Sequence, residues 1–355
     1  MKRRHERDFG AIYCNRDETI ESHEEEAGKP SAAIIGAGVS GLSAARFLRA
    51  EGVAVRVYEK SRGPGGRLAT RRRQGLTFDM GAQYLTIRDD RFMEASSPWI
   101  EAGVLASWMP RLAIISEEGR RERKPHTERF VGVPRMSALT RYLAEHLQVT
   151  CRCRIAELRR SDQGWRPVSD DGEQQPPADT VILALPAPQA AELLPDGHPL
   201  WEPIRGVRMA PCWAVMAAFP EAVPADVDAA FVNVGPLSWV ARDSSKPGRD
   251  AGHCWVLHAS EEWSCEHLDA SPESVCTALL KAFKETVAPV PEPVHIEAHR
   301  WRYARAPAPL GVLSLWDEAT RIGVCGDWCC TNRVEGAFRS GVSIAETVAA
   351  SEVGT

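Results

Sequence analysis

The chain has 355 residues, of which 44% are hydrophobic and 26% charged, so two domains or one large domain with a sizeable core are expected. Its formal net charge of −5 argues against general nucleic-acid binding. No apolar run approaches the roughly 18 residues of a membrane span. Residues 1–30 are highly charged and lack the apolar stretch of a secretory signal. We therefore expect a cytoplasmic protein with a disordered extension over residues 1–30.

A strand, a glycine turn and a helix are predicted next. The apolar run 32–35 leads into Gly36-Ala37-Gly38-Val39-Ser40-Gly41 and then a helical pattern. Gly36 allows a tight turn, Gly38 lets the backbone approach a pyrophosphate, and Gly41 lets the helix pack closely. The helix start at Ser40 offers N–H groups to phosphates. Glu59 ends the following strand, about twenty residues on, where an acid can hold a ribose 2′-OH. The alternative is an ordinary βαβ turn without a nucleotide.

A glycine-rich loop follows Glu59-Lys60, where a nicotinamide dehydrogenase would have a crossover helix. It ends in Gly65-Gly66-Arg67, so its backbone can come close to phosphates and Arg67 can bring them charge. The basic run Arg71-Arg72-Arg73 has two readings, phosphate binding or a solvated loop. Small residues then recur in Asp79-Met80-Gly81-Ala82-Gln83-Tyr84, which suits a backbone passing close to a flat ring.

The nucleotide domain is predicted to be discontinuous. A helix from Pro134 to Leu147, a strand from Val149 to Ile155 and a buried strand at 180–186 extend it. We assign residues 31–87, 130–204 and 295–350 to this domain, and residues 88–129 and 205–294 to a substrate domain.

The insert at 205–294 is rich in β-type runs, at 212–219, 237–242 and 254–259, followed by a helix capped by Ser271. A mixed or antiparallel sheet forming the substrate wall is predicted. In the run Trp255-Val256-Leu257-His258, Trp255 and His258 point to opposite faces. Residues singled out for the substrate wall are Trp239, Arg242, Trp255, His258, Arg300 and Tyr303. We expect Lys246, in a Pro-Gly turn, at the surface or facing a phosphate, and Trp255 in the core.

The last segment repeats the nucleotide signal. A buried strand at 321–325 ends in Gly326-Asp327-Trp328, and Val334-Glu335-Gly336-Ala337-Phe338 opens a final helix. Asp327 would accept hydrogen bonds from a cofactor, and the helix start would direct N–H groups at developing negative charge. Ten cysteines lack zinc-type spacing, so reduced thiols and no metal site are expected.

These motifs together resemble the flavoprotein amine oxidase superfamily, and within it the bacterial renalases. The resemblance covers nearly everything after residue 31, including motifs in the substrate half such as Ser245-Lys246-Pro247-Gly248-Arg249-Asp250 and His299-Arg300-Trp301-Arg302-Tyr303-Ala304. It implies an α/β fold: a Rossmann-like FAD domain of the amine oxidase/p-hydroxybenzoate hydroxylase type plus a substrate domain with a mixed or antiparallel sheet. FAD would be bound non-covalently, since Cys329 is not where covalently linked members attach the flavin.

The resemblance further implies an oxidase of misreduced pyridine dinucleotides, the 2- and 6-dihydro isomers of NAD(P). The hydride would pass to flavin N5, molecular oxygen would be reduced to hydrogen peroxide, and the role would be metabolite repair. The cofactor-binding candidates are Gly36, Gly38, Ser40, Gly41, Glu59, Lys60, Gly66, Arg67, Gly81, Ala82, Gln83, Ile155, Gly326, Asp327, Val334 and Glu335. The candidates for catalysis or substrate contact are Tyr84, Trp239, His258 and Arg333.

Two alternatives stay open from the sequence. A flavin-dependent amine oxidase would carry an aromatic cage, and Arg333 stands where the resemblance places one cage position. A guanidinium there would repel a cationic amine. A non-catalytic FAD-binding protein is the second alternative. His258 also has a structural reading, as a satisfied core histidine. The sequence leaves the oligomeric state, the preferred isomer and the choice between NAD and NADP open.

Overall fold

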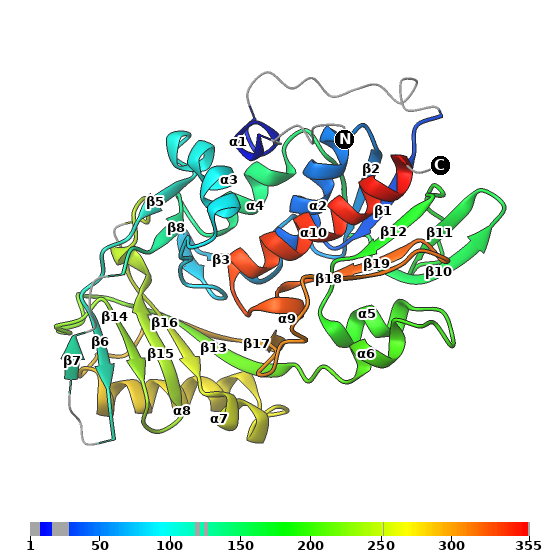
Figure 1. Cartoon of the computed structure of the whole chain (residues 1–355). Coiled ribbons are helices and arrows are strands. Elements are labelled where there is room, and N and C mark those ends of the chain that lie inside the picture. Colours follow the sequence, from blue (N-terminus) through cyan, green and yellow to red (C-terminus); the bar gives the residue numbers. More distant parts are fainter. Residues whose placement is uncertain (1–7, 16–27, 118–120, 124–126, 251, 354–355) are drawn as a thin grey trace.

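The computed structural model describes residues 8–15, 28–117, 121–123, 127–250 and 252–353, and it is built on two large sheets (Figure 1). The first has six strands in the order β18-β19-β12-β1-β2-β9. Their bounds are Ser314–Asp317 (β18), Ile322–Cys325 (β19), Thr180–Leu183 (β12), Ser31–Ile35 (β1), Ala54–Glu59 (β2) and Gln148–Cys151 (β9). All neighbours run parallel except β18 and β19. The predicted Rossmann-like fold is confirmed.

Strand β1 shows why helices cover both faces of this sheet. Its residues alternate between two cores: Ala32 and Ile34 pack on one face, Ala33 and Ile35 on the other. The first face carries α2 (Val39–Ala50), α3 (Asp90–Glu101), α4 (Ser137–Ala144) and α10 (Val334–Val353). The second carries α5 (Ala187–Leu193), α6 (Trp201–Arg205) and the hairpin of β10 (Ile155–Ser161) and β11 (Gly164–Ser169).

The second sheet has seven strands in the order β17-β13-β16-β15-β14-β6-β7. Their bounds are His295–Arg305 (β17), Ala210–Phe219 (β13), His253–Ala259 (β16), Leu237–Arg242 (β15), Ala229–Val232 (β14), Leu112–Ile115 (β6) and Arg121–Arg123 (β7). Only β14 and β6 are parallel, so the sheet is mixed, as predicted. Helices α7 (Glu261–Glu266) and α8 (Pro272–Thr286) lie beside it, and Ser271 caps α8 as expected (Figure 1).

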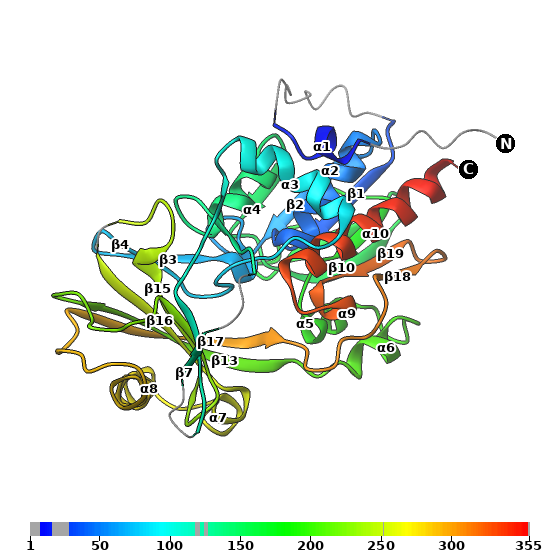
Figure 2. The ribbon, with the colours of Figure 1, turned by 60° about the vertical axis from the view of Figure 1, so that its left-hand side comes forward.

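Short elements join the two sheets (Figure 2). The hairpin of β3 (Thr70–Arg73) and β4 (Leu76–Asp79) places Phe78 and Met80 against residues of β13 and β16. Strands β5 (Leu105–Ser107) and β8 (Phe130–Gly132) form a separate pair. The remaining short helices are η1 (Gly66–Leu68), η2 (Asp243–Ser245) and α9 (Asp327–Cys330). The loops at the sheet junction therefore come from segments far apart in the sequence.

The expected disordered extension is wrong for residues 8–15. Helix α1 (Phe9–Ile12) docks on the first sheet's helical layer, with Phe9 and Tyr13 buried in its core. The Tyr13 hydroxyl donates to the carbonyl of Ser43 at 2.8 Å, and Trp99 Nε1 donates to the Tyr13 carbonyl at 3.0 Å. Polar contacts add to this packing, since Arg46 donates to the carbonyls of Ile12 and Cys14 and Asn15 is hydrogen-bonded to Tyr142. Residues 1–7 and 16–27 lie outside the described chain.

The predicted domain boundary at residue 295 also needs correction. Strand β17 pairs with β13, so residues 295–305 belong to the substrate sheet, and the return to the first sheet begins with β18. Helix α3 lies in the segment 88–129 that was assigned to the substrate domain, but it packs in the core of the first sheet with α10. Within the described residues, no helix has the length and apolar character needed to cross a membrane.

Candidate functional site

The glycine turn after β1 is shaped for close contact with a nucleotide. Gly36 has a φ of +112°, and a Cβ on Gly41 would lie 2.1 Å from the carbonyl oxygen of Gly36. The second loop reaches the same place, since a Cβ on Gly66 would lie 3.3 Å from the Cα of Gly38. Ser40, in the first turn of α2, has a buried hydroxyl beside the buried thiol of Cys325. A helix start beside a cradle free of side chains fits a dinucleotide diphosphate.

A cavity of about 260 Å³ opens beside this turn, at the carboxyl ends of β1 and β2. Its lining includes Glu59, Lys60 and Ile155, three of the predicted cofactor residues, together with Gly36. Tyr58 also lines it, and its buried hydroxyl has no partner in the described structure. The carboxyl ends of parallel strands are where doubly wound sheets bind nucleotides, so this cavity suits an adenosine group.

Glu59 joins the glycine turn after β1 to the glycine-rich loop after β2 through hydrogen bonds within the protein. One carboxylate oxygen accepts from the amide of Ala37 at 2.9 Å and the other from the amide of Ser61 at 2.8 Å. The side chain is buried. Because a carboxylate has about four acceptor sites, two remain for ribose hydroxyls.

Arg67 and Asp327 bring the two predicted halves of the cofactor site into direct contact. The guanidinium donates to both carboxylate oxygens, at 3.0 and 2.5 Å, and also to the carbonyl of Ala304 at 3.1 Å. Asp327 opens α9, directly after β19, while Arg67 lies in η1. The pair therefore fixes the second glycine loop against the strand end from the last segment.

The loop from Asp79 to Tyr84 is clamped along its backbone. The carbonyl of Met80 accepts from Trp301 Nε1 at 3.0 Å and contacts His258 Nε2 at 3.1 Å. Gly81 is required there, because its Cβ would lie 2.1 Å from the carbonyl oxygen of Arg67. The amide of Gln83 donates to the carbonyls of Asp79 and Gly81. The Gln83 side chain thus closes its own loop.

His258 is a neutral imidazole that holds this loop. Burial lowers its pKa to about 4, although the contact with the Met80 carbonyl opposes the shift. The neutral ring with its proton on Nε2 donates to Met80, so its other nitrogen is an acceptor. Trp255 lies on the opposite face, fully buried, with its ring 5.0 Å from that of Phe283. Both the predicted opposite orientation and the core role of Trp255 are confirmed.

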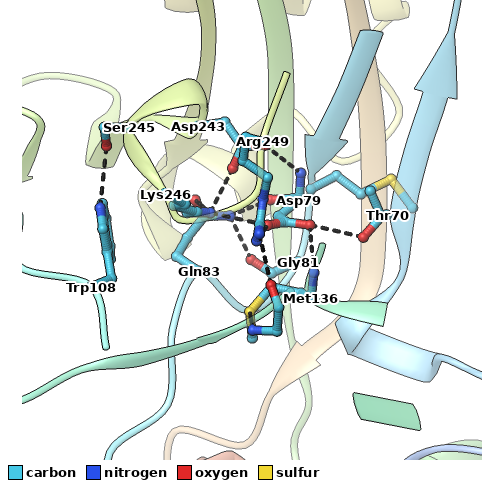
Figure 3. Close-up of polar contacts among 12 residues, drawn as sticks. Thr70, Asp79, Gly81, Gln83, Trp108, Met136, Asp243, Ser245, Lys246 and Arg249 are labelled. Carbon is cyan, nitrogen blue, oxygen red and sulfur yellow. Dashed lines mark hydrogen bonds and ion pairs between the residues drawn. The ribbon is translucent and has the colours of Figure 1, made fainter. Parts of the chain in front are cut away.

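A buried ionic cluster lies behind the loop (Figure 3). Asp79 accepts from Arg249 at 2.5 Å, from Lys246 at 3.4 Å, from Thr70 Oγ1 at 2.8 Å and from the amide of Met136 at 3.0 Å. Burial would raise the pKa of Asp79, but the charges of Lys246 and Arg249 keep it below its usual value. The cluster joins the loop at 79–84 to the substrate domain at 243–249.

Lys246 is the center of that cluster, and the expectation that it is exposed or faces a phosphate is wrong. Its side chain is fully buried, and its ammonium donates to Asp243 at 2.5 Å and to Gln83 at 3.2 Å. Burial raises the pKa of Asp243, opposed by the charge of Lys246. Sequence reasoning missed the cluster. The one available signal was Asp79 directly between the apolar residues Phe78 and Met80.

Aromatic side chains gather beside the cluster. Tyr84 lies 5.6 Å from the ring of Trp239 and 6.4 Å from that of Trp108, measured between ring centroids. Two cations cover these rings: Lys246 lies 5.6 Å from the Trp108 centroid, and Arg129 lies 5.1 Å from the Tyr84 centroid. Tyr84 and Trp239 were predicted together. Trp108 and Arg129 were not, because no local pattern distinguishes them.

The start of α10 differs in detail from the expectation. Glu335 is buried, and its carboxylate accepts from the amides of Arg88 and Asp89 at 2.6 and 3.0 Å. Glu335 thus anchors the helix start, beginning at Val334, to the 88–89 loop. Arg333 is exposed and forms no ion pair with Glu335. The amide of Gly326 donates to Ser340 Oγ at 2.8 Å, which ties the preceding strand end to the same helix.

Several other predicted residues have structural partners. Arg242 pairs with Asp228, and Arg300 donates to Asp269 at 3.1 Å, so neither is a free substrate-wall cation. Tyr303 is half-buried. Arg71 and Arg73 both pair with Glu297 of β17. All ten cysteines are free thiols, and burial raises the pKa of the Cys329 thiol. No group of His, Cys, Asp and Glu in the described chain could hold a metal ion.

Comparison with known proteins agrees with this geometry. The family described as flavin containing amine oxidoreductase matches residues 90–349, and an NAD(P)-binding Rossmann-like domain matches residues 34–95. Renalase from Mus musculus is 23% identical over 291 residues, which cover 77% of this chain and 84% of that protein.

Solved structures show the same fold at low identity. Cyclohexylamine oxidase from Brevibacterium oxydans IH-35A superposes with a TM-score of 0.69 at 13% identity, covering 91% of this chain and 99% of that one. A triple mutant of putrescine oxidase gives a TM-score of 0.69 at 15% identity with the same coverage. The family match over residues 90–349, most of the chain, identifies it as a member of the flavin-containing amine oxidoreductases.

Proposed function

We propose that this enzyme is an FAD-dependent oxidase of misreduced pyridine dinucleotides, the 2- and 6-dihydro isomers of NAD(P), and that it acts in metabolite repair in the cytoplasm. The observation that carries the proposal is the charge around the aromatic cluster. Lys246 is neutralised by its carboxylate partners, but Arg129 covers the Tyr84 ring at 5.1 Å without an ion pair to a described carboxylate, a setting that repels a protonated amine and suits a dinucleotide. The similarity to mouse renalase supports the same conclusion.

The residues present fit non-covalent FAD. The glycine cradle at the start of α2 would hold the diphosphate, Glu59 a ribose, and the cavity lined by Tyr58 and Ile155 the adenine. The amides at the start of α10 would face the pyrimidine edge of the flavin. When bound, FAD supplies a two-electron acceptor for the hydride, and O₂ is the final oxidant, reduced to hydrogen peroxide.

The side chains need only bind and orient the substrate. A dihydropyridine that gives up a hydride becomes an aromatic pyridinium, and no proton has to be removed from it. This agrees with the state of the two ionisable groups beside the loop. His258 is neutral and donates to Met80, and Lys246 is fully engaged by Asp79, Asp243 and Gln83. Tyr84 and Trp239 would stack the ring, and exposed Arg333 would attract the polar part of the dinucleotide.

Anaerobic stopped-flow mixing tests the proposal. The purified holoenzyme is mixed with 2-, 4- and 6-dihydroNAD and, separately, with putrescine and cyclohexylamine, and flavin absorbance is followed. We expect rapid bleaching with the 2- or 6-dihydro isomer and none with the amines. Bleaching by an amine alone would show an amine oxidase. A flavin that none of these compounds reduces would favour a non-catalytic protein.

A further inference from the structure

We propose that Arg129 binds the phosphate group on the nicotinamide half of the substrate and so selects phosphorylated pyridine nucleotides over their nucleosides. This inference rests on the proposed function and adds to it a specificity-determining residue. The guanidinium of Arg129 is buried and forms no ion pair with a carboxylate of the described residues.

Arg129 immediately precedes β8 and is 7% exposed. Its Nη1 donates to the carbonyl of Thr127 at 2.7 Å, and its Nε is buried without a hydrogen-bond partner. No carboxylate of the described residues forms an ion pair with it. The nearby cluster shows the opposite arrangement, since Asp79, Asp243 and Lys246 are equally buried and all paired.

A buried charge without a counter-charge destabilises the ligand-free protein, because its lost hydration is not repaid. Such a group is retained where something else supplies the missing partner. The guanidinium offers five donors in a planar fork that matches a phosphate, and only one of its donors is shown to be used within the protein.

The surroundings of Arg129 place it in the aromatic cluster. The bridge between Leu85 and Phe130 aligns two antiparallel segments, so the side chains of Tyr84 and Arg129 lie on the same face. The guanidinium lies over the Tyr84 ring, and on the same ring packs Trp239, whose Nε1 is also buried without a partner. Two unused donors therefore adjoin the ring proposed to stack the nicotinamide.

A phosphate accounts for the unpaired charge of Arg129 and for the two unused donors better than the carboxamide of the nicotinamide does. A neutral carbonyl could accept one hydrogen bond and would leave the charge of Arg129 uncompensated, whereas a phosphate neutralises it and has oxygens for a second donor. The cofactor diphosphate has its own cradle at the start of α2. The other anionic source at this site is the reduced flavin, and the experiment separates the two.

Nicotinamide mononucleotide and nicotinamide riboside differ only by one phosphate. The affinity of the oxidised holoenzyme for each is measured by calorimetric titration. We expect the wild type to bind the mononucleotide at least tenfold more tightly, Arg129→Met to lose that preference, and Arg129→Lys to keep part of it. Arg91→Met is the matched control: Arg91 also covers a ring, that of Phe9, but it is exposed and paired with Glu346. It should keep the full preference. A preference that is absent from the wild type, or that survives in Arg129→Met, overturns the proposal.

Two further measurements separate this role from a structural one. Arg129→Met holoenzyme without substrate should unfold at a temperature no lower than that of the wild type, because an unpaired charge has been removed. A marked fall in the unfolding temperature would show a structural role. The flavin midpoint potential should also be unchanged. A shifted potential together with an intact phosphate preference would make the reduced flavin the partner and overturn the proposal. Since the titrations use oxidised ligands, they stand even if no dihydropyridine reduces the flavin.

Discussion

Arg67 and Asp327 are 260 positions apart in the chain, and they meet in a two-pronged ion pair at 3.0 and 2.5 Å. The pair is mostly shielded from solvent, with side-chain exposures of 28% and 11%. It joins the second glycine loop to the end of β19, so the cofactor cradle is closed by residues from both ends of the fold. The integrity of this contact should govern how tightly FAD is held.

Asp327→Asn should therefore weaken FAD binding by about tenfold or more, since hydrogen bonds to charged groups contribute about 1.5–3 kcal/mol. The affinity is measured by titrating the apoprotein with FAD and following flavin fluorescence. Glu346→Gln is the control, because it breaks the exposed pair with Arg91, a kind of interaction worth about 0–1 kcal/mol. Equal affinity in Asp327→Asn and the wild type would show that the pair does not support the cofactor site.

Helix α1 should contribute to the stability of the fold, although the charged sequence around it suggests a disordered segment. Tyr13 is fully buried, with its ring 5.0 Å from that of Phe338 in α10. Tyr13→Ala should lower the free energy of unfolding by about 3–5 kcal/mol, as for other buried aromatic side chains. Tyr13→Phe removes only the hydrogen bond to Ser43 and should lower it by about 0.5–1.5 kcal/mol. Urea denaturation of the two variants gives both values. Wild-type stability in Tyr13→Ala would mean that α1 docks without contributing to the fold.

The sequence predicted best those features that depend on neighbours in the chain. The turn Gly36–Gly41 was recognisable because glycine is required there by contacts within the turn itself. The structure has no room for a Cβ at Gly41. Strand β15 has the predicted bounds, 237–242, because Gly235-Pro236 precedes the run and the polar residues Asp243 and Ser244 follow it. Ser271 was identified as a cap because capping is decided within one helical turn.

Features decided by distant contacts were missed. Lys246 follows a short helical turn and precedes Pro-Gly, a local pattern typical of the surface, yet Asp79 and Gln83 from another segment bury it. The partner of Arg67 could not be read from sequence, and neither could the absence of an anion beside Arg129 in the described structure. Strand β17 was assigned to the wrong domain because nothing in its own sequence distinguishes pairing with β13 from pairing with a strand of the first sheet.

The neutral state of His258 predicts a pH dependence of stability. Its pKa is about 4 in the folded protein, below the ordinary value near 6.5, so the unfolded chain binds the proton more readily. The contribution of neutral His258 to the free energy of unfolding is complete above about pH 6.5. It is lost as the pH falls toward 4, by up to about 1.4 kcal/mol per pH unit. His299, whose pKa burial also lowers to about 4, adds to the same slope.

Urea denaturation between pH 7.5 and 4.5 measures this effect. His258→Gln can still donate to the Met80 carbonyl but does not titrate, so its stability should fall less steeply with decreasing pH than that of the wild type. His299→Gln is the companion variant and should remove the other part of the slope. An identical slope in His258→Gln and the wild type would show that His258 titrates normally in the folded protein.

The last prediction separates the charges of the buried cluster. Lys246→Met leaves Asp243 without its cation at 2.5 Å and should lower the free energy of unfolding by about 3–5 kcal/mol. Burial already raises the pKa of Asp243, so this carboxyl should take up a proton in the variant. The double variant Lys246→Met with Asp243→Asn removes both charges and leaves the pair of Asp79 and Arg249 intact, so it should be more stable than Lys246→Met alone.

Lys281→Met, which breaks an exposed pair with Glu285, is the control for the buried cluster and should change the free energy of unfolding by less than about 1 kcal/mol. A double variant whose loss equals the sum of the losses in Lys246→Met and Asp243→Asn would show that Lys246 and Asp243 are energetically independent.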